Sequence, residues 1–302
     1  MSLLARLATV QIVPPTPFSA DGKRVLTEPL AALAKELYAA GMRVFLPAAG
    51  TGEFHSLSTD EVVECVRVVR QSVGRDAVVL APLGFALQES LTIGRGAIEA
   101  GADALLIMPP VHPYLADCGF RDYFQALAQE LSLPFLAYKR GPVPSDKLLL
   151  DLAQTGRLIG VKYAVNELDG FTRFALAAPA TLGLYCGTAE RYAPFFMLAG
   201  AAGYTSGAGN VCPRLTLAMH AHLAAGRYAD AMRIMQLIRP IEDYRAREGD
   251  SFNITLLKYA LELKGLPFGP PRAPQRQLND AERSDIRRLI EVVLNEEAKL
   301  AS

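Results

Sequence analysis

Apolar residues along this chain gather into short unbroken runs, and longer amphipathic stretches separate one run from the next. Several of these stretches end in glycine just before the next apolar run, as at Gly41, Gly101 and Gly200. Glycine closes a helix because it adopts positive φ at little steric cost. An unbroken run of about four to six apolar residues is typical of a strand buried on both faces. The pattern therefore predicts helices that alternate with parallel strands.

The number of these units predicts an α/β fold, a closed (β/α)8 TIM barrel. An open doubly wound sheet is the alternative, and the eight predicted strands favour the barrel. Amphipathic patterns predict helices over residues 29–40, 59–73, 87–100 and 120–131. The predicted strands are Thr9–Val13, Val44–Leu46, Ala77–Ala81, Ala104–Met108, Pro134–Tyr138, Leu158–Tyr163, Thr181–Cys186 and Gly203–Ser206.

The rest of the chain is expected to extend the barrel. We treat residues 1–302 as a single domain, with the barrel in 1–226 and a C-terminal helical extension in 227–302. Further helices are predicted over 227–239, 252–264 and 279–298, and the last two are separated by the Pro/Gly-rich segment 265–271. No independent second core is expected.

Composition narrows the classes of function. The 31 basic and 31 acidic residues give a net charge of zero, without the basic excess of a nucleic-acid-binding protein. No apolar run reaches the roughly 18 residues of a membrane span. The segment Met1–Leu7 is too short for a signal peptide. We therefore expect a cytoplasmic protein without a nucleic-acid or membrane partner.

Cysteine and histidine spacing gives no signal for a disulfide or a metal. The four cysteines are scattered and form no C-x-x-C pair, as is typical of isolated buried thiols. His220 and His222 form an H-x-H pair within a predicted helix, where residues two apart do not face each other. No metal site is expected.

A lysine in an apolar strand is the first candidate for chemistry. Lys162 lies in the strand at residues 159–163 (Ile-Gly-Val-Lys-Tyr), where burying an ammonium group is costly. In one interpretation, Lys162 faces outward or pairs with a carboxylate. In the other, desolvation lowers its pKa and leaves a neutral amine that attacks a carbonyl. Tyr138 ends the preceding strand, where it is either a packing residue or a second catalytic group. Both lie where a barrel carries its active site.

The loop after the second predicted strand is a candidate anion site. Gly50 and Gly52 flank Thr51, so backbone N–H groups and one hydroxyl can approach a carboxylate. An ordinary tight turn is the alternative interpretation of this Gly-Thr-Gly sequence.

Taken in order, these motifs resemble the dihydrodipicolinate synthase/N-acetylneuraminate lyase family, from Pro14 to the C-terminal helices. The resemblance implies a lyase in which Lys162 forms a Schiff base with a pyruvate-like 2-keto acid and Tyr138 shuttles a proton. It also implies a homo-oligomer, either a dimer or a tetramer, and a mechanism without a metal or organic cofactor. The residues that would hold the keto acid are Thr51, with the backbone around Gly50 and Gly52, together with Gly187 and Thr205.

Within this family, the sequence departs from the synthase branch. Val143 stands where that branch has an arginine for the second substrate, and Val111 and His112 stand where it has paired tyrosines. His112 or Tyr114 is the candidate to replace the tyrosine that acts between subunits.

The chain is more similar to the branch that dehydrates keto-deoxy sugar acids, such as 5-dehydro-4-deoxyglucarate dehydratase. That resemblance implies contacts from Arg140, Ser206 and Asn210 to hydroxyls or to a distal carboxylate of the substrate. Lys139 and Tyr163 depart from the usual pattern of this branch.

Two other functions stay open at this point. One is the condensation of pyruvate with an aldehyde, as in dihydrodipicolinate synthase. The other is a non-catalytic barrel that binds a keto acid or, through the glycine-rich segment 207–210, a phosphate.

Overall fold

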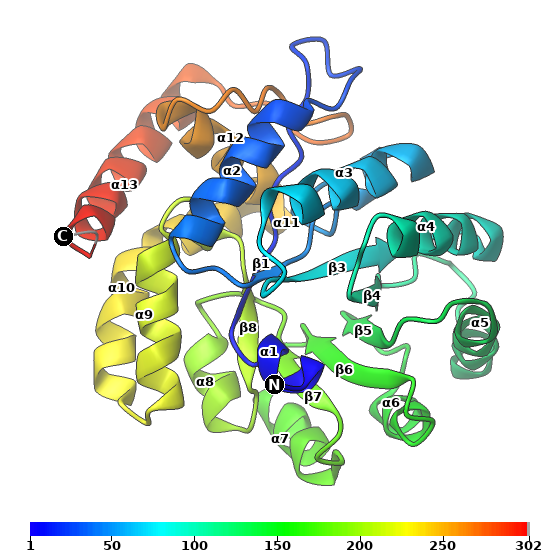
Figure 1. Cartoon of the computed structure of the whole chain (residues 1–302). Coiled ribbons are helices and arrows are strands. Elements are labelled where there is room, and N and C mark those ends of the chain that lie inside the picture. The colour runs from blue at the N-terminus through cyan, green and yellow to red at the C-terminus, as the bar shows by residue number, and fades with distance from the viewer. Residues whose placement is uncertain (301–302) are drawn as a thin grey trace.

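The computed structural model describes residues 1–300 and confirms the predicted barrel (Figure 1). Eight parallel strands pair in the order of the sequence, and the last strand closes on the first. The strands are β1 (Val10–Ile12), β2 (Val44–Phe45), β3 (Val78–Leu83), β4 (Ala104–Ile107), β5 (Phe135–Lys139), β6 (Leu158–Tyr163), β7 (Gly183–Cys186) and β8 (Gly203–Ser206).

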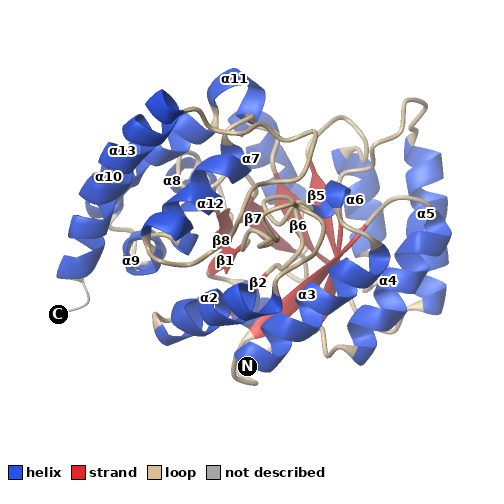
Figure 2. Cartoon of the chain, turned by 90° about the horizontal axis from the view of Figure 1, so that it is seen from above, coloured by secondary structure: helices blue, strands red, loops and turns tan. Residues whose placement is uncertain are grey.

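Helices surround this barrel on the outside (Figures 1 and 2). A short helix α1 (Leu3–Leu7) precedes β1, and the turns η1 (Phe54–Ser56) and η2 (Ala208–Asn210) follow β2 and β8. The outer helices are α2 (Thr27–Ala39), α3 (Thr59–Ser72), α4 (Leu87–Glu99), α5 (Asp117–Glu130), α6 (Asp146–Ala153), α7 (Leu168–Ala177), α8 (Ala193–Leu198) and α9 (Pro213–Ala224).

Local sequence fixes where α3 begins. The Ser58 hydroxyl accepts a hydrogen bond from the Glu61 N–H, and the Glu61 carboxylate accepts one from the Ser58 N–H. This reciprocal capping box satisfies two backbone donors that the first turn of a helix leaves free. Val62, Val66 and Val69 then recur on one face and are buried against the barrel core.

The C-terminal extension consists of α10 (Tyr228–Arg245), the turn α11 (Arg247–Asp250), α12 (Asn253–Leu263) and α13 (Asp280–Lys299). These helices lie together on one side of the barrel, next to α9 (Figure 1). The helix α10 is longer than the predicted 227–239 and includes Pro240. It continues because Ile241 and Tyr244 are buried, and that burial outweighs the hydrogen bond lost at the proline.

A second apolar cluster lies under the extension. The cluster is not independent, because it contains residues from both sides of position 226. We therefore propose that the chain is one domain, with the barrel in 1–226 and the extension in 227–302, of which residues 301–302 lie outside the described residues. The cluster includes Ala208, Val211, Cys212 and Leu215 before that position, and Ile238, Leu256, Leu257, Ile286 and Ile290 after it.

The described residues contain neither a membrane-spanning helix nor a cluster of metal ligands. No helix within residues 1–300 has both the length and the apolar character to cross a bilayer. In the same residues no group of three or more His, Cys, Asp or Glu side chains could hold a metal ion. The cysteines are free thiols: Cys65, Cys186 and Cys212 are buried, and Cys118 is exposed.

Candidate active site

A cavity of about 580 Å³ lies at the C-terminal ends of the strands, between the barrel and the extension. Eight of the ten predicted site residues line it, whereas Gly52 and Asn210 do not. The eight are Gly50, Thr51, Tyr138, Arg140, Lys162, Gly187, Thr205 and Ser206.

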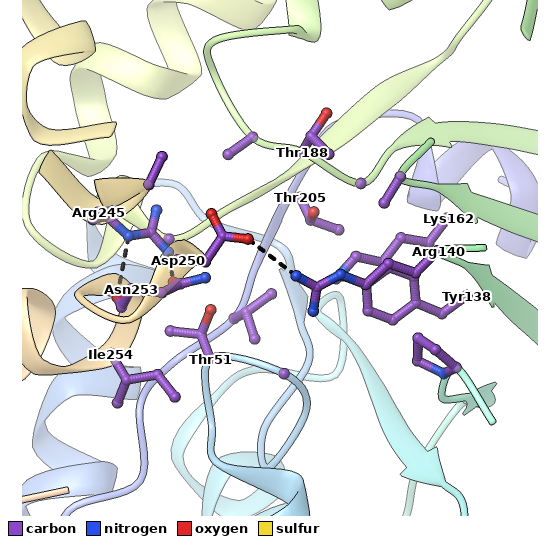
Figure 3. A pocket seen from close by; sticks show the side chains of 18 of the residues that line it. Thr51, Tyr138, Arg140, Lys162, Thr188, Thr205, Arg245, Asp250, Asn253 and Ile254 are labelled. Carbon is purple, nitrogen blue, oxygen red and sulfur yellow. Dashed lines mark hydrogen bonds and ion pairs between the residues drawn. The ribbon is translucent and has the colours of Figure 1, made fainter. Parts of the chain in front are cut away.

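The alternation of side chains along β5 and β6 separates two lysines. Tyr138 pairs in register with Lys162, and both point into the cavity (Figure 3). The next residues, Lys139 and Tyr163, point outward. The Lys139 ammonium donates to the Pro144 carbonyl at 2.8 Å and belongs to the structural packing outside the barrel.

Lys162 is buried without a counter-ion. Its side chain is 4% exposed, and its Nζ lies 3.9 Å from the centre of the Tyr138 ring. No carboxylate or other hydrogen-bond acceptor contacts this Nζ among residues 1–300. Burial and the nearby charge of Arg140 lower the pKa of Lys162 to about 7. At neutral pH a large share of this amine is therefore uncharged and able to act as a nucleophile.

Tyr138 faces Lys162 and remains a proton donor. Its ring is half-buried, and burial raises the pKa of its phenol above the ordinary value near 10. The hydroxyl therefore keeps its proton at neutral pH and can share it with a substrate oxygen.

Gly187 leaves space for the Lys162 side chain. It follows β7, and a Cβ on it would lie 3.1 Å from Cγ of Lys162 and 2.8 Å from Cβ of Ala164. A larger residue here would crowd Ala164, the Tyr163 carbonyl and the stem of Lys162.

The loop after β2 places Thr51 in the cavity wall (Figure 3), with Gly50 beside it. Gly52 is not among the residues that line the cavity, although the sequence predicted it beside the substrate. A Cβ on Gly52 would lie 2.7 Å from Cα of Ala48, so glycine is needed for close packing within the loop. The Gly52 carbonyl accepts a hydrogen bond from the Thr16 hydroxyl at 2.7 Å, which holds the loop in place.

Asn210 also requires a correction, because it lies outside the cavity. Its side-chain amide is buried and donates at 2.9 Å to the carbonyl oxygens of both Val13 and Gly207. Asn210 therefore ties the end of β1 to the segment after β8, and both donors of its amide are already used. Thr205 and Ser206 are buried at the cavity wall nearby.

The extension supplies a second wall that the sequence did not indicate. Arg245 and Asn253 line the cavity on the side away from Lys162 and Tyr138 (Figure 3). The buried Arg245 guanidinium pairs with Glu242 at 2.5 Å and donates to Asn253. In the sequence, Glu242 and Arg245 are three residues apart in an amphipathic helix, a spacing typical of an exposed ion pair.

An ion pair crosses the mouth of the cavity. Arg140, in the loop after β5, lies 3.1 Å from a carboxylate oxygen of Asp250 in the extension (Figure 3). Asp250 has φ of 66°, and the preceding Glu248 and Gly249 also have positive φ. This left-handed turn carries the carboxylate over the cavity toward the barrel.

Comparison with known proteins gives a consistent result. The sequence profile of the Dihydrodipicolinate synthetase family matches residues 6–293. The "Probable 5-dehydro-4-deoxyglucarate dehydratase 2" of Streptomyces coelicolor is 33% identical over 276 residues, which cover 89% of this chain and 81% of that protein. The 4-hydroxy-tetrahydrodipicolinate synthase of Corynebacterium diphtheriae is 29% identical over 94% of both chains.

Solved structures agree with this assignment. The crystal structure of dihydrodipicolinate synthase from Bacillus clausii superposes with a TM-score of 0.92 and 34% identity, over 96% of this chain and 99% of that one. Both the sequence profile and this structure span nearly the whole chain. The chain therefore belongs to the dihydrodipicolinate synthetase family of Schiff-base lyases.

Proposed function

We propose that Lys162 forms a Schiff base with a 2-keto acid and that the protein dehydrates or cleaves a keto-deoxy sugar acid. The observation that carries this proposal is the buried Lys162 amine, which lines a cavity and lacks a counter-ion. The neutral amine adds to the 2-carbonyl, and loss of water leaves an imine. The protonated imine withdraws electrons from C3, so a C3 proton leaves and an enamine forms.

The neighbouring groups fit this sequence of steps. The Tyr138 hydroxyl donates to the oxygen that leaves the carbonyl carbon. Thr51 and the backbone around Gly50 hold the carboxylate, which orients the 2-carbonyl toward Lys162. Thr205 and Gly187 complete the wall beside the imine, and Arg140 lies at the mouth, where it can meet a distal anionic group.

Dehydration is the reaction we favour for the enamine. A hydroxyl at C4 leaves as hydroxide, which takes up a proton to become water, and the C3–C4 bond gains double-bond character. Val143 supports dehydration over condensation. The synthase branch has an arginine at this position to hold the second substrate, and the apolar Val143 cannot play that part. The printed name of the Streptomyces relative supports the same choice.

A phosphate site in the segment 207–210 is less compatible with the local hydrogen bonds. The Gly209 N–H donates to the Ser206 hydroxyl at 2.8 Å, and the Asn210 N–H donates to the Gly207 carbonyl at 3.1 Å. These backbone donors are therefore already used and do not form a free cradle for an anion.

We also propose a cytoplasmic homo-oligomer, either a dimer or a tetramer. Val111 and Tyr114, in the loop after β4, are 82% and 88% exposed, a large apolar exposure for a single copy. Analytical ultracentrifugation tests this assignment, and a purely monomeric protein at micromolar concentration contradicts it. His112 lies in the same exposed loop, and we propose it or Tyr114 as the group that acts between subunits.

The experiment that tests the activity is reductive trapping. The protein is incubated with pyruvate or with sugar-derived 2-keto acids, reduced with borohydride and weighed intact and after digestion. We expect an adduct on Lys162, absent in Lys162→Ala and retained in Lys147→Met, which removes an exposed lysine on α6. If a folded sample gives no adduct with any 2-keto acid, the Schiff-base proposal is rejected. The 2-keto acids are then ranked by the amount of adduct they form. Preference for a sugar-derived 2-keto acid over pyruvate supports dehydration, and the opposite preference supports condensation.

A further inference from the structure

Each arginine that lines the cavity is already paired with a carboxylate of the extension. Among residues 1–300, the cavity wall contains one lysine and three arginines. The three arginines form the pairs Arg140–Asp250 at 3.1 Å, Arg191–Asp243 at 3.2 Å and Arg245–Glu242 at 2.5 Å. Of these four cations at the wall, only Lys162 therefore lacks a carboxylate partner within the described residues.

This pairing fits a ligand with a single negative charge. A protonated imine at Lys162 is an unpaired cation in the cavity, and the carboxylate beside the 2-carbonyl of the ligand neutralises it. His55 also lines the cavity, but burial and the nearby charge of Arg140 lower its pKa and keep it neutral. A second carboxylate at the other end of the ligand would have to separate an existing ion pair and leave an acid of the extension unpaired.

The pair of Arg140 and Asp250 is the most exposed of the three. Its side chains are 59% and 48% exposed, whereas those of Arg245 and Glu242 are 7% and 5% exposed. Figure 3 shows the Arg140 guanidinium and the Asp250 carboxylate facing each other in the cavity. Besides burial, the charge of Asp250 raises the pKa of the Tyr138 phenol, as expected for a carboxylate held over the site. A ligand that reaches beyond Tyr138 therefore meets this pair.

The same pair presents a hydrogen-bond donor beside an acceptor. A guanidinium only donates and an ionised carboxylate only accepts, whereas a hydroxyl does both. A hydroxyl can therefore accept from Arg140 and donate to Asp250 while the ion pair stays intact. A ligand carboxylate cannot donate to Asp250, and the negative charge of that residue repels it.

We propose that Asp250, through its ion pair with Arg140, is a specificity-determining residue that selects a keto acid with one carboxylate and a neutral, hydroxyl-bearing distal end. The ligand class is then the 2-keto-3-deoxyaldonic acids, and the aldaric acids, which carry a carboxylate at both ends, are disfavoured. The inference rests on the proposed function and narrows the distal group that Arg140 meets to a hydroxyl.

The test compares kcat/KM for a 2-keto-3-deoxyaldonic acid with kcat/KM for the aldaric acid of the same chain length and stereochemistry. The wild type should prefer the aldonic acid by more than about tenfold. The difference should lie mainly in KM, because the distal end does not react. In Asp250→Asn, Arg140 is free to take a second carboxylate, so this preference should fall by more than about tenfold. Asparagine tolerates the φ of 66° at this position, so the variant should fold.

Two further variants show whether the change comes from this ion pair. Adding Arg140→Met to Asp250→Asn removes the freed cation and should abolish the gain for the aldaric acid. Asp230→Asn is the matched control, because it breaks an exposed ion pair with Arg233 at 2.6 Å elsewhere on α10, and it should leave the preference unchanged. If Asp250→Asn does not fold, Asp250→Gly replaces it, since glycine accepts positive φ without strain.

Several outcomes overturn the inference. A wild type that prefers the aldaric acid does so, as does an unchanged preference in folded Asp250→Asn or an equal change in Asp230→Asn. Pyruvate has no distal end, so its borohydride adduct on Lys162 reports the proposed function alone. A pyruvate adduct together with a preference for the aldaric acid rejects this inference alone, whereas failure of every 2-keto acid to leave an adduct rejects the proposed function.

Discussion

Two buried lysines in this protein have opposite surroundings. The Nζ of Lys162, at the barrel mouth, lies 3.9 Å from the centre of the Tyr138 ring and meets no carboxylate within residues 1–300. Lys258, in α12 of the extension, forms an ion pair with Glu53 at 2.6 Å and donates to the Pro270 carbonyl at 3.1 Å. Its Nζ also lies 4.0 Å from the centre of the Phe18 ring. One lysine is left unpaired, and the other is fully partnered.

The partners decide what a buried ammonium does. Burial lowers the pKa of Lys162 to about 7 and that of Lys258 to about 8, although Glu53 opposes the fall at Lys258. Lys258 therefore stays mostly protonated at neutral pH and joins the loop after β2 to the extension. Lys162 has no such partner, so the fraction of its amine that is uncharged at neutral pH is available as a nucleophile.

The largest effect is expected from Lys162→Ala. Removing the nucleophile lowers kcat/KM by more than about 10⁴-fold, because every later step depends on the imine. Thermal unfolding should show no loss of stability, since no ion pair or hydrogen bond is broken. Activity assays and calorimetry on the same sample check both parts. A variant that keeps activity within tenfold of the wild type contradicts the assigned role.

The opposite result is expected from Lys258→Met. This change leaves Glu53 buried without its partner and lowers the free energy of unfolding by about 3–5 kcal/mol. Denaturant titration measures the loss, while trapping on Lys162 persists in the folded fraction. Adding Glu53→Leu removes the unpaired charge and should recover most of the stability. If the double variant is no more stable than Lys258→Met, the ion pair is not the cause.

A smaller effect is expected from Gly187→Ala, which tests the room around Lys162. The added methyl group displaces the Lys162 side chain, and a misplacement of about 1 Å costs roughly 10²-fold in kcat/KM. Gly141→Ala is the matched control, because a Cβ on Gly141 meets nothing within 4 Å. Equal activity in the two variants shows that the space beside Lys162 is not limiting.

The smallest effect is expected from Arg140→Met. The positive charge of Arg140 lowers the pKa of Lys162, so its removal raises that pKa. The acid limb of adduct formation should move to higher pH by a fraction of a unit, as measured by the rate of borohydride trapping. The control is Arg121→Met on α5, another arginine paired with an aspartate near the surface. A limb that moves down, or moves equally in the control, excludes direct electrostatic control by Arg140.

The sequence predicted the barrel because its strands are buried on both faces and read as continuous apolar runs. Lys162 was recognisable for the same reason, since a charge within such a run is exceptional. Its lack of a counter-ion was not predictable, because that depends on side chains brought together from separate strands and loops. Asn210 illustrates the same difficulty: its type suits a substrate contact, yet its amide donates to the carbonyl of Val13, which is distant in sequence, and to that of nearby Gly207.

The wall from the extension was missed for a different reason. Arg245 and Glu242 lie beyond residue 239, where the sequence predicted the helix to end. The helix also continues past Pro240, where local sequence alone predicts an end. Only the packing of α10 against α9 and α13 turns these residues toward the cavity. A buried arginine in a helical tail is therefore a feature of tertiary structure and not of local pattern.

The division of the cavity between barrel and extension has a consequence for engineering and for divergence. The residues proposed for the covalent chemistry lie at Gly50 and Thr51 and between Tyr138 and Ser206, whereas the facing wall lies between Glu242 and Ile254. A segment exchange that replaces only the second stretch would present new side chains to the far end of a ligand while leaving the nucleophile untouched. Such chimeras, or natural gene fusions, could therefore act on new substrates while the reaction at Lys162 stays the same.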